Sequence, residues 1–200
     1  MVYLYATSIL DLQDPLESPE VLQELPKERQ KKILNCKQKQ KRLQSLAAGR
    51  LLQNVLSQYG ISPEEIYHDE NGKPMVPGIY FNLAHSGDVV ICAVSEKPVG
   101  CDIEQIKEAP RRVVKSFCSA LEKAYLEQFE GEEYNRAFFR IWTKKESYLK
   151  MTGIGIRVPL NKVEVKDCYI QEYLMDGYQI TVCAEENDFA ELCWKFFYMI

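Results

Sequence analysis

The spacing of hydrophobic and polar positions changes along the first sixty residues. Segment 2–8, VYLYATS, is rich in β-branched and aromatic residues, which is typical of a strand. From 27 to 58, apolar residues recur every three or four positions, with the basic residues mostly between them. This period predicts a long helical stretch, broken once.

The middle of the chain predicts a hairpin and then a helical region. IYFNLAHS and VVICAVS have the composition of strands, and Gly87 and Asp88 between them are turn residues. A further short strand is expected at 99–104. The stretch 110–152 is mainly helical in pattern and ends in a strong helix over 138–151.

The last forty residues predict antiparallel strands joined by short turns, in the segments VEVKD, YIQEYLM, YQITVCAEE and ELCWKFFYMI. Strands and helices therefore occur in both parts of the chain. We expect an α+β fold of two strand-and-helix halves, an N-terminal half 1–100 and a C-terminal half 101–200.

The composition is that of an ordinary globular protein, with 46% hydrophobic and 27% charged residues in a chain of 200. No apolar run approaches the roughly 20 residues of a transmembrane helix, and the N-terminus lacks the pattern of a signal peptide. The seven cysteines are scattered without a C-x-x-C pair. We therefore expect reduced thiols and a cytoplasmic protein, not a disulfide scaffold.

The charge is unevenly distributed. Residues 27–50 hold nine Lys or Arg against the single acid Glu28, whereas the whole chain carries a net charge of -4. This basic segment favours an anionic ligand, with a solvated helix face as the alternative.

Two carboxylates share one face of the strand expected at 99–104. The two-residue period places Asp102 and Glu104 on one face and the apolar residues between them on the other. Adjacent carboxylates repel unless a cation compensates, and Mg²⁺ prefers carboxylate oxygen. The alternative is a solvent-facing strand that simply carries two charges.

The strong helix adds an acid and two lysines. Glu146 and Lys150, spaced i and i+4, lie at one margin of its apolar stripe, where the alternative is an ordinary helix ion pair. Lys145 falls within the stripe, where an unpaired ammonium is costly, so we expect it to snorkel or to have a carboxylate partner.

His85 stands at the end of an expected strand, next to Ser86. Adjacent side chains diverge on a strand, which argues against a nucleophilic Ser-His pair and favours contact with a phosphate. A structural histidine is the alternative.

Taken in order, four blocks resemble the 4′-phosphopantetheinyl transferases of the surfactin-synthetase-activating type. The blocks are Gly72-Lys73-Pro74, Phe81-Asn82-Leu83-Ala84-His85-Ser86-Gly87, Val99-Gly100-Cys101-Asp102-Ile103-Glu104, and Trp142-Thr143-Lys144-Lys145-Glu146-Ser147-Tyr148-Leu149-Lys150 with Gly153 and Gly155. The resemblance spans about residues 25–160. It implies a pseudo-twofold pair of α/β halves with coenzyme A at their interface. It also implies transfer of the phosphopantetheine arm to a serine of an apo acyl, peptidyl or aryl carrier protein, with release of 3′,5′-adenosine bisphosphate.

The resemblance assigns expected roles to nine residues of this chain. The family's magnesium-binding acids match Asp102, Glu104 and Glu146. The lysine that contacts the transferred phosphate matches Lys150. Our candidate for the base that accepts the serine proton is Glu146 or a metal-bound water that it activates. The expected coenzyme A ligands are Lys73 and His85, Arg29 and Lys31 in the basic N-terminal region, and Arg42, ranked ahead of Arg50, near the adenine nucleotide.

Two departures and three rival functions stay open at this point. The family often has serine where Ala84 stands, and Ser86 is the neighbouring hydroxyl; Cys101 replaces a branched aliphatic residue. The rivals are a magnesium-dependent phosphohydrolase, a nucleic-acid-binding module that uses residues 27–50, and a family member without activity. We expect a monomer whose partners are coenzyme A and a carrier protein, not nucleic acid or a membrane.

Overall fold

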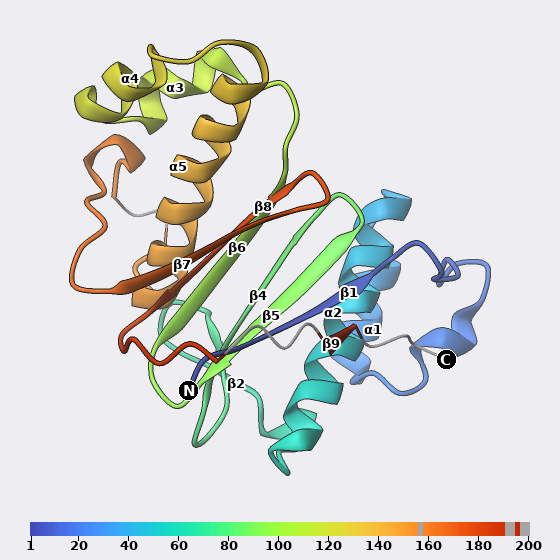
Figure 1. Ribbon diagram of the computed structural model, residues 1–200. Coiled ribbons are helices and arrows are strands. Elements are labelled where there is room, and N and C mark those ends of the chain that lie inside the picture. The colour runs from blue at the N-terminus through green and yellow to red at the C-terminus, as the bar shows by residue number, and fades with distance from the viewer. Residues whose placement is uncertain (156–157, 191–194, 197–200) are drawn as a thin grey trace.

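The first sheet is built mainly from the N-terminal half of the chain. The computed structural model describes residues 1–155, 158–190 and 195–196. The strand order is β4 (Tyr80–Ser86), β5 (Val89–Ser95), β1 (Tyr3–Ser8) and β9 (Lys195–Phe196). β5 pairs antiparallel with both β4 and β1, while the short β9 joins β1 in parallel (Figure 1).

The second sheet contains three antiparallel strands, in the order β6 (Val99–Gln105), β8 (Tyr178–Ala184) and β7 (Tyr169–Met175). β2 (Tyr67–His68) and β3 (Pro74–Met75) form a separate small hairpin. β4 lies beside β6, since the Asn82 side chain accepts a hydrogen bond from the Cys101 backbone N–H at 2.9 Å. The two sheets therefore meet along β4 and β6.

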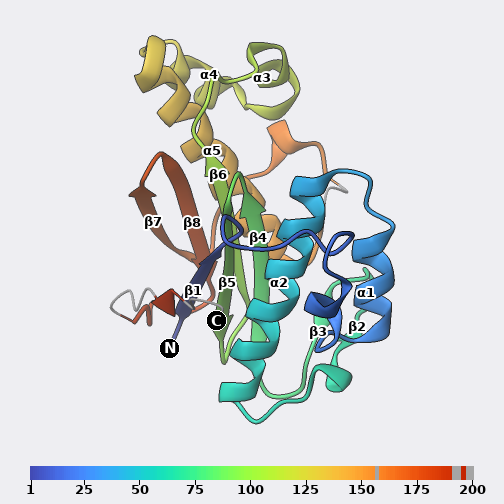
Figure 2. The ribbon, with the colours of Figure 1, turned by 90° about the vertical axis from the view of Figure 1, so that its right-hand side faces the viewer.

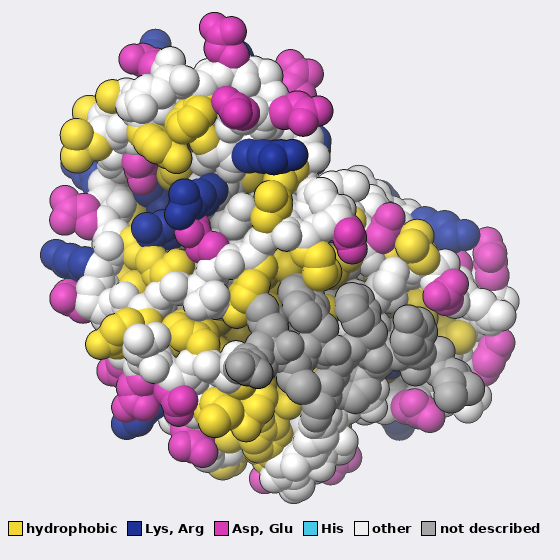
Figure 3. All heavy atoms as spheres, in the orientation of Figure 1, with side chains coloured by type: hydrophobic (Ala, Val, Ile, Leu, Met, Phe, Trp, Pro, Cys, Tyr) yellow, Lys and Arg dark blue, Asp and Glu magenta, His cyan; other side chains and the backbone are white. Residues whose placement is uncertain are grey.

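Five α-helices accompany the sheets in the described ranges: α1 (Lys27–Leu34), α2 (Lys39–Gln58), α3 (Arg111–Phe117), α4 (Ala120–Leu126) and α5 (Gly131–Thr152). α2 covers the outer face of the first sheet, as Figure 2 shows, with α1 and the β2–β3 hairpin beyond it. α5 packs on the second sheet, against β6 and β8. On the face drawn in Figure 3, acidic and basic side chains are interspersed over the end formed by α3 and α4.

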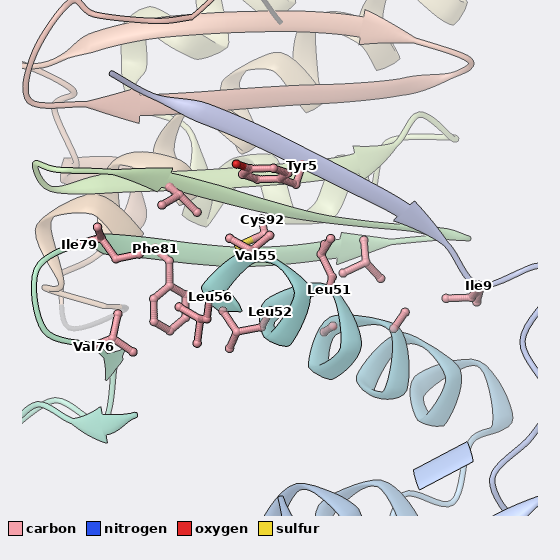
Figure 4. Packing of buried hydrophobic residues seen from close by; sticks show 14 of the residues in the cluster. Tyr5, Ile9, Leu51, Leu52, Val55, Leu56, Val76, Ile79, Phe81 and Cys92 are labelled. Atoms are coloured by element: carbon pink, nitrogen blue, oxygen red, sulfur yellow. The ribbon is translucent and has the colours of Figure 1, made fainter. Parts of the chain in front are cut away.

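Three buried clusters hold these layers together. Leu51, Val55 and Leu56 of α2 pack against the outer face of the first sheet (Figure 4). Val99, Cys101 and Ile103 of β6 are buried between the two sheets. A third cluster, around Phe117 and Phe138, joins α3, α4 and α5. Each half therefore repeats one arrangement, a sheet with a long helix on its outer face, and the predicted α+β class with antiparallel sheets is confirmed.

Helix α5 comes unusually close to β6. A Cβ atom at Gly100 would overlap the Ser147 carbonyl oxygen and the Met151 amide nitrogen of the helix, and would lie 2.9 Å from Met151 Cα. Only glycine permits this approach. At its end, α5 stops at Gly153, whose φ of 70° is the left-handed conformation of a helix C-terminus. Gly100 therefore fixes how near the helix side chains come to β6.

The predicted partner of Lys145 is present. Lys145 is 1% exposed, and its Nζ atom donates to Glu122 Oε2 at 2.6 Å and to the carbonyl oxygens of Phe117 and Leu160 at 3.1 and 2.9 Å. All three ammonium protons are used. This buried lysine therefore ties α5 to α3, α4 and the 3₁₀ turn Leu160–Lys162.

Most of the expected elements are confirmed, with one clear error. Segment 163–167 was expected to be a strand, but it has no regular structure and follows a 3₁₀ turn. Asp167 has a φ of 55°, which is incompatible with a continuous strand into β7. The helix expected at 138–151 starts earlier, at Gly131. The strand expected at the C-terminus falls outside the described residues except for 195–196.

The division into halves 1–100 and 101–200 stays a prediction; residue 100 lies inside β6, and β9 returns to the first sheet. Among the described helices, none combines the length and the apolar character that crossing a bilayer requires.

Candidate active site

The first part of the candidate site lies where β6 meets α5. Asp102 is buried on β6, and its Oδ1 atom accepts a hydrogen bond from Lys150 Nζ at 2.6 Å. The same ammonium donates to the Cys101 carbonyl oxygen at 3.2 Å. The other carboxylate oxygen, Asp102 Oδ2, is buried and has no hydrogen-bond partner within the described residues. A buried, unpartnered carboxylate oxygen is costly, so Asp102 Oδ2 is an unused acceptor that a further ligand would satisfy.

Glu104 is two residues further along β6, on the same face as Asp102. Its Oε2 atom accepts a hydrogen bond from the Ser86 hydroxyl at 2.7 Å, and Ser86 Oγ in turn accepts one from the Gln105 backbone N–H at 3.1 Å. Ser86 closes β4, so the first sheet supports an acid of the second sheet. The sequence left Ser86 open, and only the register of β4 along β6 reveals this contact.

The acids influence one another electrostatically. Burial raises the pKa of Asp102, and the Glu104 and Glu146 carboxylates raise it further, while Lys150 opposes the rise. Burial also raises the pKa of Glu146; Lys150 again opposes the rise, and Glu104 adds to it. Burial by itself would lower the pKa of Lys150, but the charge and hydrogen bond of Asp102, with smaller contributions from Cys101 and Glu146, together outweigh burial and the pKa rises. This mutual dependence places the three acids and the lysine in one electrostatic neighbourhood.

The donor set fits a hard divalent cation in its chemistry. Across the described ranges, no three His, Cys, Asp or Glu side chains lie close enough together to form a preassembled metal cluster. Lys150 instead neutralises Asp102 directly. Burial first, and then the repulsion of neighbouring carboxylates, nevertheless raise the pKa of Asp102 and Glu146, and Asp102 Oδ2 has no partner among the described residues; Mg²⁺ coordinated to these oxygens would relieve the repulsion.

A basic cleft adjoins these acids. It consists of two hollows of about 740 and 410 Å³ that share Arg29, Lys32 and Leu83, between α1, α2, β4 and the β2–β3 hairpin. Lys41 and His85 line the larger hollow, and Gly72 and Pro74 line the smaller one. Two of the three residues that the hollows share, Arg29 and Lys32, are therefore cationic.

His85 connects the cleft to the acids. Desolvation lowers the pKa of His85, and the charges of Lys150, Arg29 and Lys41 lower it further. Arg29 Nη2 donates to the Ser45 carbonyl oxygen at 3.1 Å, while its buried Nε atom has no partner among the described residues. Converging cations and an unpartnered guanidinium N–H indicate a place for an anion.

The remaining expected ligands occupy different surroundings. Lys73 Nζ donates to the Lys150 carbonyl oxygen at 2.7 Å, so the β2–β3 hairpin is attached to the end of α5. Burial lowers the pKa of Lys73. Lys31 is exposed on α1, whereas its neighbour Lys32 lines the cleft.

Arg42 is engaged within the protein. Its guanidinium pairs with Asp14 through bonds of 2.9 and 2.5 Å and donates to the carbonyl oxygens of Cys36 and Lys37. Arg50 donates to the Val21 carbonyl oxygen at 2.9 Å. This arrangement favours a structural role for Arg42, which connects the loop before α1 with the segment between α1 and α2. A contact between Arg42 and a nucleotide stays a prediction.

Sequence reasoning missed Lys32 and Lys41 as cleft residues. Both belong to the basic segment that the sequence singles out, but a charge count does not say which side chains share a helix face with the cleft. The relative placement of α1 and α2 decides this, and it depends on the break between the two helices.

Comparison with known proteins assigns the class. The model of the family described as "4'-phosphopantetheinyl transferase superfamily" matches residues 98–196, a range that contains Asp102, Glu104, Glu146 and Lys150. The 4'-phosphopantetheinyl transferase Sfp of Bacillus subtilis (strain 168) is 34% identical over 164 residues, covering 70% of this chain and 73% of that protein. The 4'-phosphopantetheinyl transferase psf-1 of Bacillus pumilus is also 34% identical over 164 residues, with 70% of each chain covered.

The chain therefore belongs to the 4′-phosphopantetheinyl transferase superfamily. Its type is the surfactin-synthetase-activating one, as the Bacillus relatives show, which confirms the resemblance drawn from the four motifs. The enzyme is accordingly a 4′-phosphopantetheinyl transferase.

Proposed function

We propose that the enzyme transfers the 4′-phosphopantetheine group of coenzyme A to a serine of an apo carrier protein, with Mg²⁺, and releases 3′,5′-adenosine bisphosphate. The observation that carries the proposal is the placement of three acids and Lys150 beside a basic cleft, in a chain of this family. Transfer from a pyrophosphate requires cationic groups that neutralise charge on the phosphate oxygens. It also requires acids that hold a metal ion close to those oxygens.

The cleft is proposed as the coenzyme A site. Arg29, Lys32, Lys41 and His85 would pair with phosphate oxygens, and Arg29 Nε offers an unused donor. Bound phosphate would also oppose the cationic surroundings that lower the pKa of His85. Lys73, expected from the family to contact a phosphate, lies against the end of α5, between the cleft and Lys150.

Asp102, Glu104 and Glu146 are proposed to hold the metal. Mg²⁺, when bound, would neutralise charge on the pyrophosphate oxygens. Lys150 would contact the transferred phosphate, exchanging its bond with Asp102 for one with a phosphoryl oxygen. This exchange is reasonable because the neighbouring acids, Asp102 first, raise the pKa of Lys150 against the effect of burial, and so keep the ammonium charged and close to the acids.

The transfer is proposed to be a nucleophilic displacement at the β-phosphorus of coenzyme A. The serine hydroxyl oxygen forms a bond to the β-phosphorus of coenzyme A, and the bond from that phosphorus to the bridging oxygen breaks. The bridging oxygen leaves with the adenosine bisphosphate. The serine proton passes to a base, for which Glu146 is proposed, because burial raises its pKa and makes it a better proton acceptor than an exposed carboxylate.

Two expectations accompany this proposal. The six described cysteines are all free thiols, which agrees with work in a reducing compartment, and we propose the cytoplasm. We also propose that the enzyme acts as a monomer, because the two α/β halves of one chain supply both the basic cleft and the acids.

Acid variants test the assignment. Asp102→Asn and Glu146→Gln should abolish transfer to a carrier while coenzyme A binding and cooperative unfolding persist. Glu133→Gln, an exposed acid on the same helix, is the control and should keep full activity. Transfer at the wild-type rate by either site variant would remove that acid from the site.

A further inference from the structure

The turn between β4 and β5 is held by both halves of the protein. The Gly87 carbonyl oxygen accepts a hydrogen bond from the Gln44 side-chain amide of α2 at 2.9 Å. On the other side, the Tyr178 hydroxyl of β8 accepts a hydrogen bond from the Asp88 backbone N–H at 3.0 Å. Gln44 and Tyr178 are both buried. Ser86, directly before this turn, therefore has a backbone fixed from two directions.

The hydroxyl of Ser86 both donates and accepts a hydrogen bond at the boundary of the two sheets. It donates its proton to Glu104 Oε2 at 2.7 Å and accepts the N–H of Gln105 at 3.1 Å. The Gln105 N–H uses one lone pair of the hydroxyl, and the proton points at Glu104 Oε2, the acceptor at 2.7 Å. A hydrogen bond to one carboxylate oxygen fixes the rotation of the group and leaves Glu104 Oε1 for a second ligand.

Glu104 needs such support more than its neighbour does. Asp102 has a short side chain and is bonded to Lys150, whereas Glu104 has one more rotatable bond and lies at the less buried end of β6. An unsupported glutamate would lose this conformational freedom on binding a cation, at a cost in affinity.

We propose that Ser86 is a positioning residue that orients Glu104 for the divalent cation, and so makes the metal site depend on contact between the two sheets. The inference rests on the proposed function for the identity of the metal site. Ser86 acts through Glu104 and does not itself touch the cation or the substrate.

The test measures cation binding directly. Mn²⁺ binding to the whole protein is followed by electron paramagnetic resonance, with and without coenzyme A, for the wild type, Ser86→Ala and Ser86→Thr. Ser86→Ala should weaken Mn²⁺ binding about 10- to 100-fold, as loss of a group that supports a metal ligand usually does. Ser86→Thr keeps the hydroxyl and should restore binding to within about threefold.

Kinetics separate positioning from substrate contact. Ser86→Ala should raise the Mg²⁺ concentration for half-maximal transfer, while the KM for coenzyme A at saturating Mg²⁺ stays unchanged. Ser95→Ala is the matched control. Ser95 also ends a strand, and its hydroxyl accepts a hydrogen bond from the Lys97 backbone N–H at 3.2 Å, so this variant should change neither quantity. Thermal unfolding without cation checks that all variants fold.

Each result decides between the alternatives. Unchanged Mn²⁺ affinity in Ser86→Ala overturns the inference, and so does a raised KM for coenzyme A with unchanged Mn²⁺ affinity, which would place Ser86 in the coenzyme A site. Suppose that the wild type binds Mn²⁺, that Ser86→Ala does not, and that the wild type transfers nothing to a carrier. The positioning role then stands and the proposed function fails. If the wild type transfers but the variant keeps its Mn²⁺ affinity, only the inference fails.

Discussion

Replacing Gly100 by alanine should disturb the candidate site without touching any of its side chains. The added Cβ would overlap backbone atoms of Ser147 and Met151, which cannot swing aside as a side chain can. The strand conformation itself accepts alanine, so the strain comes entirely from the helix. Helix α5 therefore has to move away from β6, or β6 has to bend.

The size of the effect follows from these contacts. Overpacking of this kind costs about 1–3 kcal/mol of unfolding free energy, and lost flexibility of the unfolded chain returns only about 0.4–1 kcal/mol. The unfolding free energy of Gly100→Ala should therefore be lower than that of the wild type. A shift of about 1 Å would stretch the 2.6 Å bond between Lys150 and Asp102 beyond hydrogen-bonding distance. A misplacement of that size at a reacting group lowers turnover about 100-fold.

Two measurements check the reasoning for Gly100→Ala. Urea unfolding gives the loss of stability, and the rate of carrier modification gives turnover. Gly49→Ala in α2 is the control for stability alone, because its new Cβ would meet flexible side chains, Leu25 at 3.0 Å and Arg29 Nε at 3.5 Å, and alanine favours a helix. If Gly100→Ala unfolds at the wild-type urea concentration and keeps wild-type turnover, the close packing of α5 does not set the site geometry.

Further predictions concern the buried lysine, the Asp14 ion pair and the hairpin lysine. Lys145→Met, which strands Glu122 and two carbonyl oxygens, should lower the unfolding free energy by about 3–5 kcal/mol in urea titrations; an unchanged midpoint would contradict the ion-pair argument. Hydrogen bonds from Arg42 lower the pKa of Asp14 from 3.8 to about 2. The stabilisation is therefore complete above pH 3.8 and is lost as the pH falls through about 2, so the stability gap between wild type and Asp14→Asn should narrow from pH 5 to pH 2.5. A stability difference between the two proteins that does not change with pH would show that Arg42 does not lower the pKa of Asp14. Lys73→Ala should raise the KM for coenzyme A more than it lowers kcat in steady-state assays, and an unchanged KM would exclude Lys73 from the coenzyme A site.

The sequence could predict features that depend on local pattern. The hairpin around Gly87, the break between α1 and α2, and the shared face of Asp102 and Glu104 follow from turn chemistry and residue period. For Lys145 the sequence left two outcomes, snorkelling or a carboxylate partner, because an ammonium inside an apolar stripe is costly; the structure shows the partner, Glu122.

Features that depend on tertiary packing could not be predicted. The Ser86–Glu104 bond needs the register of β4 along β6, which no local pattern encodes. Arg42 and Lys32 carry the same charge in the same basic segment, yet one is buried against Asp14 and the other lines the cleft. Segment 163–167 alternates like a strand, but the left-handed Asp167 separates it from β7.

Magnesium-dependent transfer of phosphopantetheine from coenzyme A to a carrier protein can be measured directly. The purified enzyme is incubated with coenzyme A, Mg²⁺ and an apo acyl or peptidyl carrier protein, and the carrier is weighed by intact-mass spectrometry beside a control without Mg²⁺. We predict that the carrier gains the mass of one phosphopantetheine only when Mg²⁺ is present. A carrier mass that stays unchanged with every acyl and peptidyl carrier, although coenzyme A binds, would contradict it.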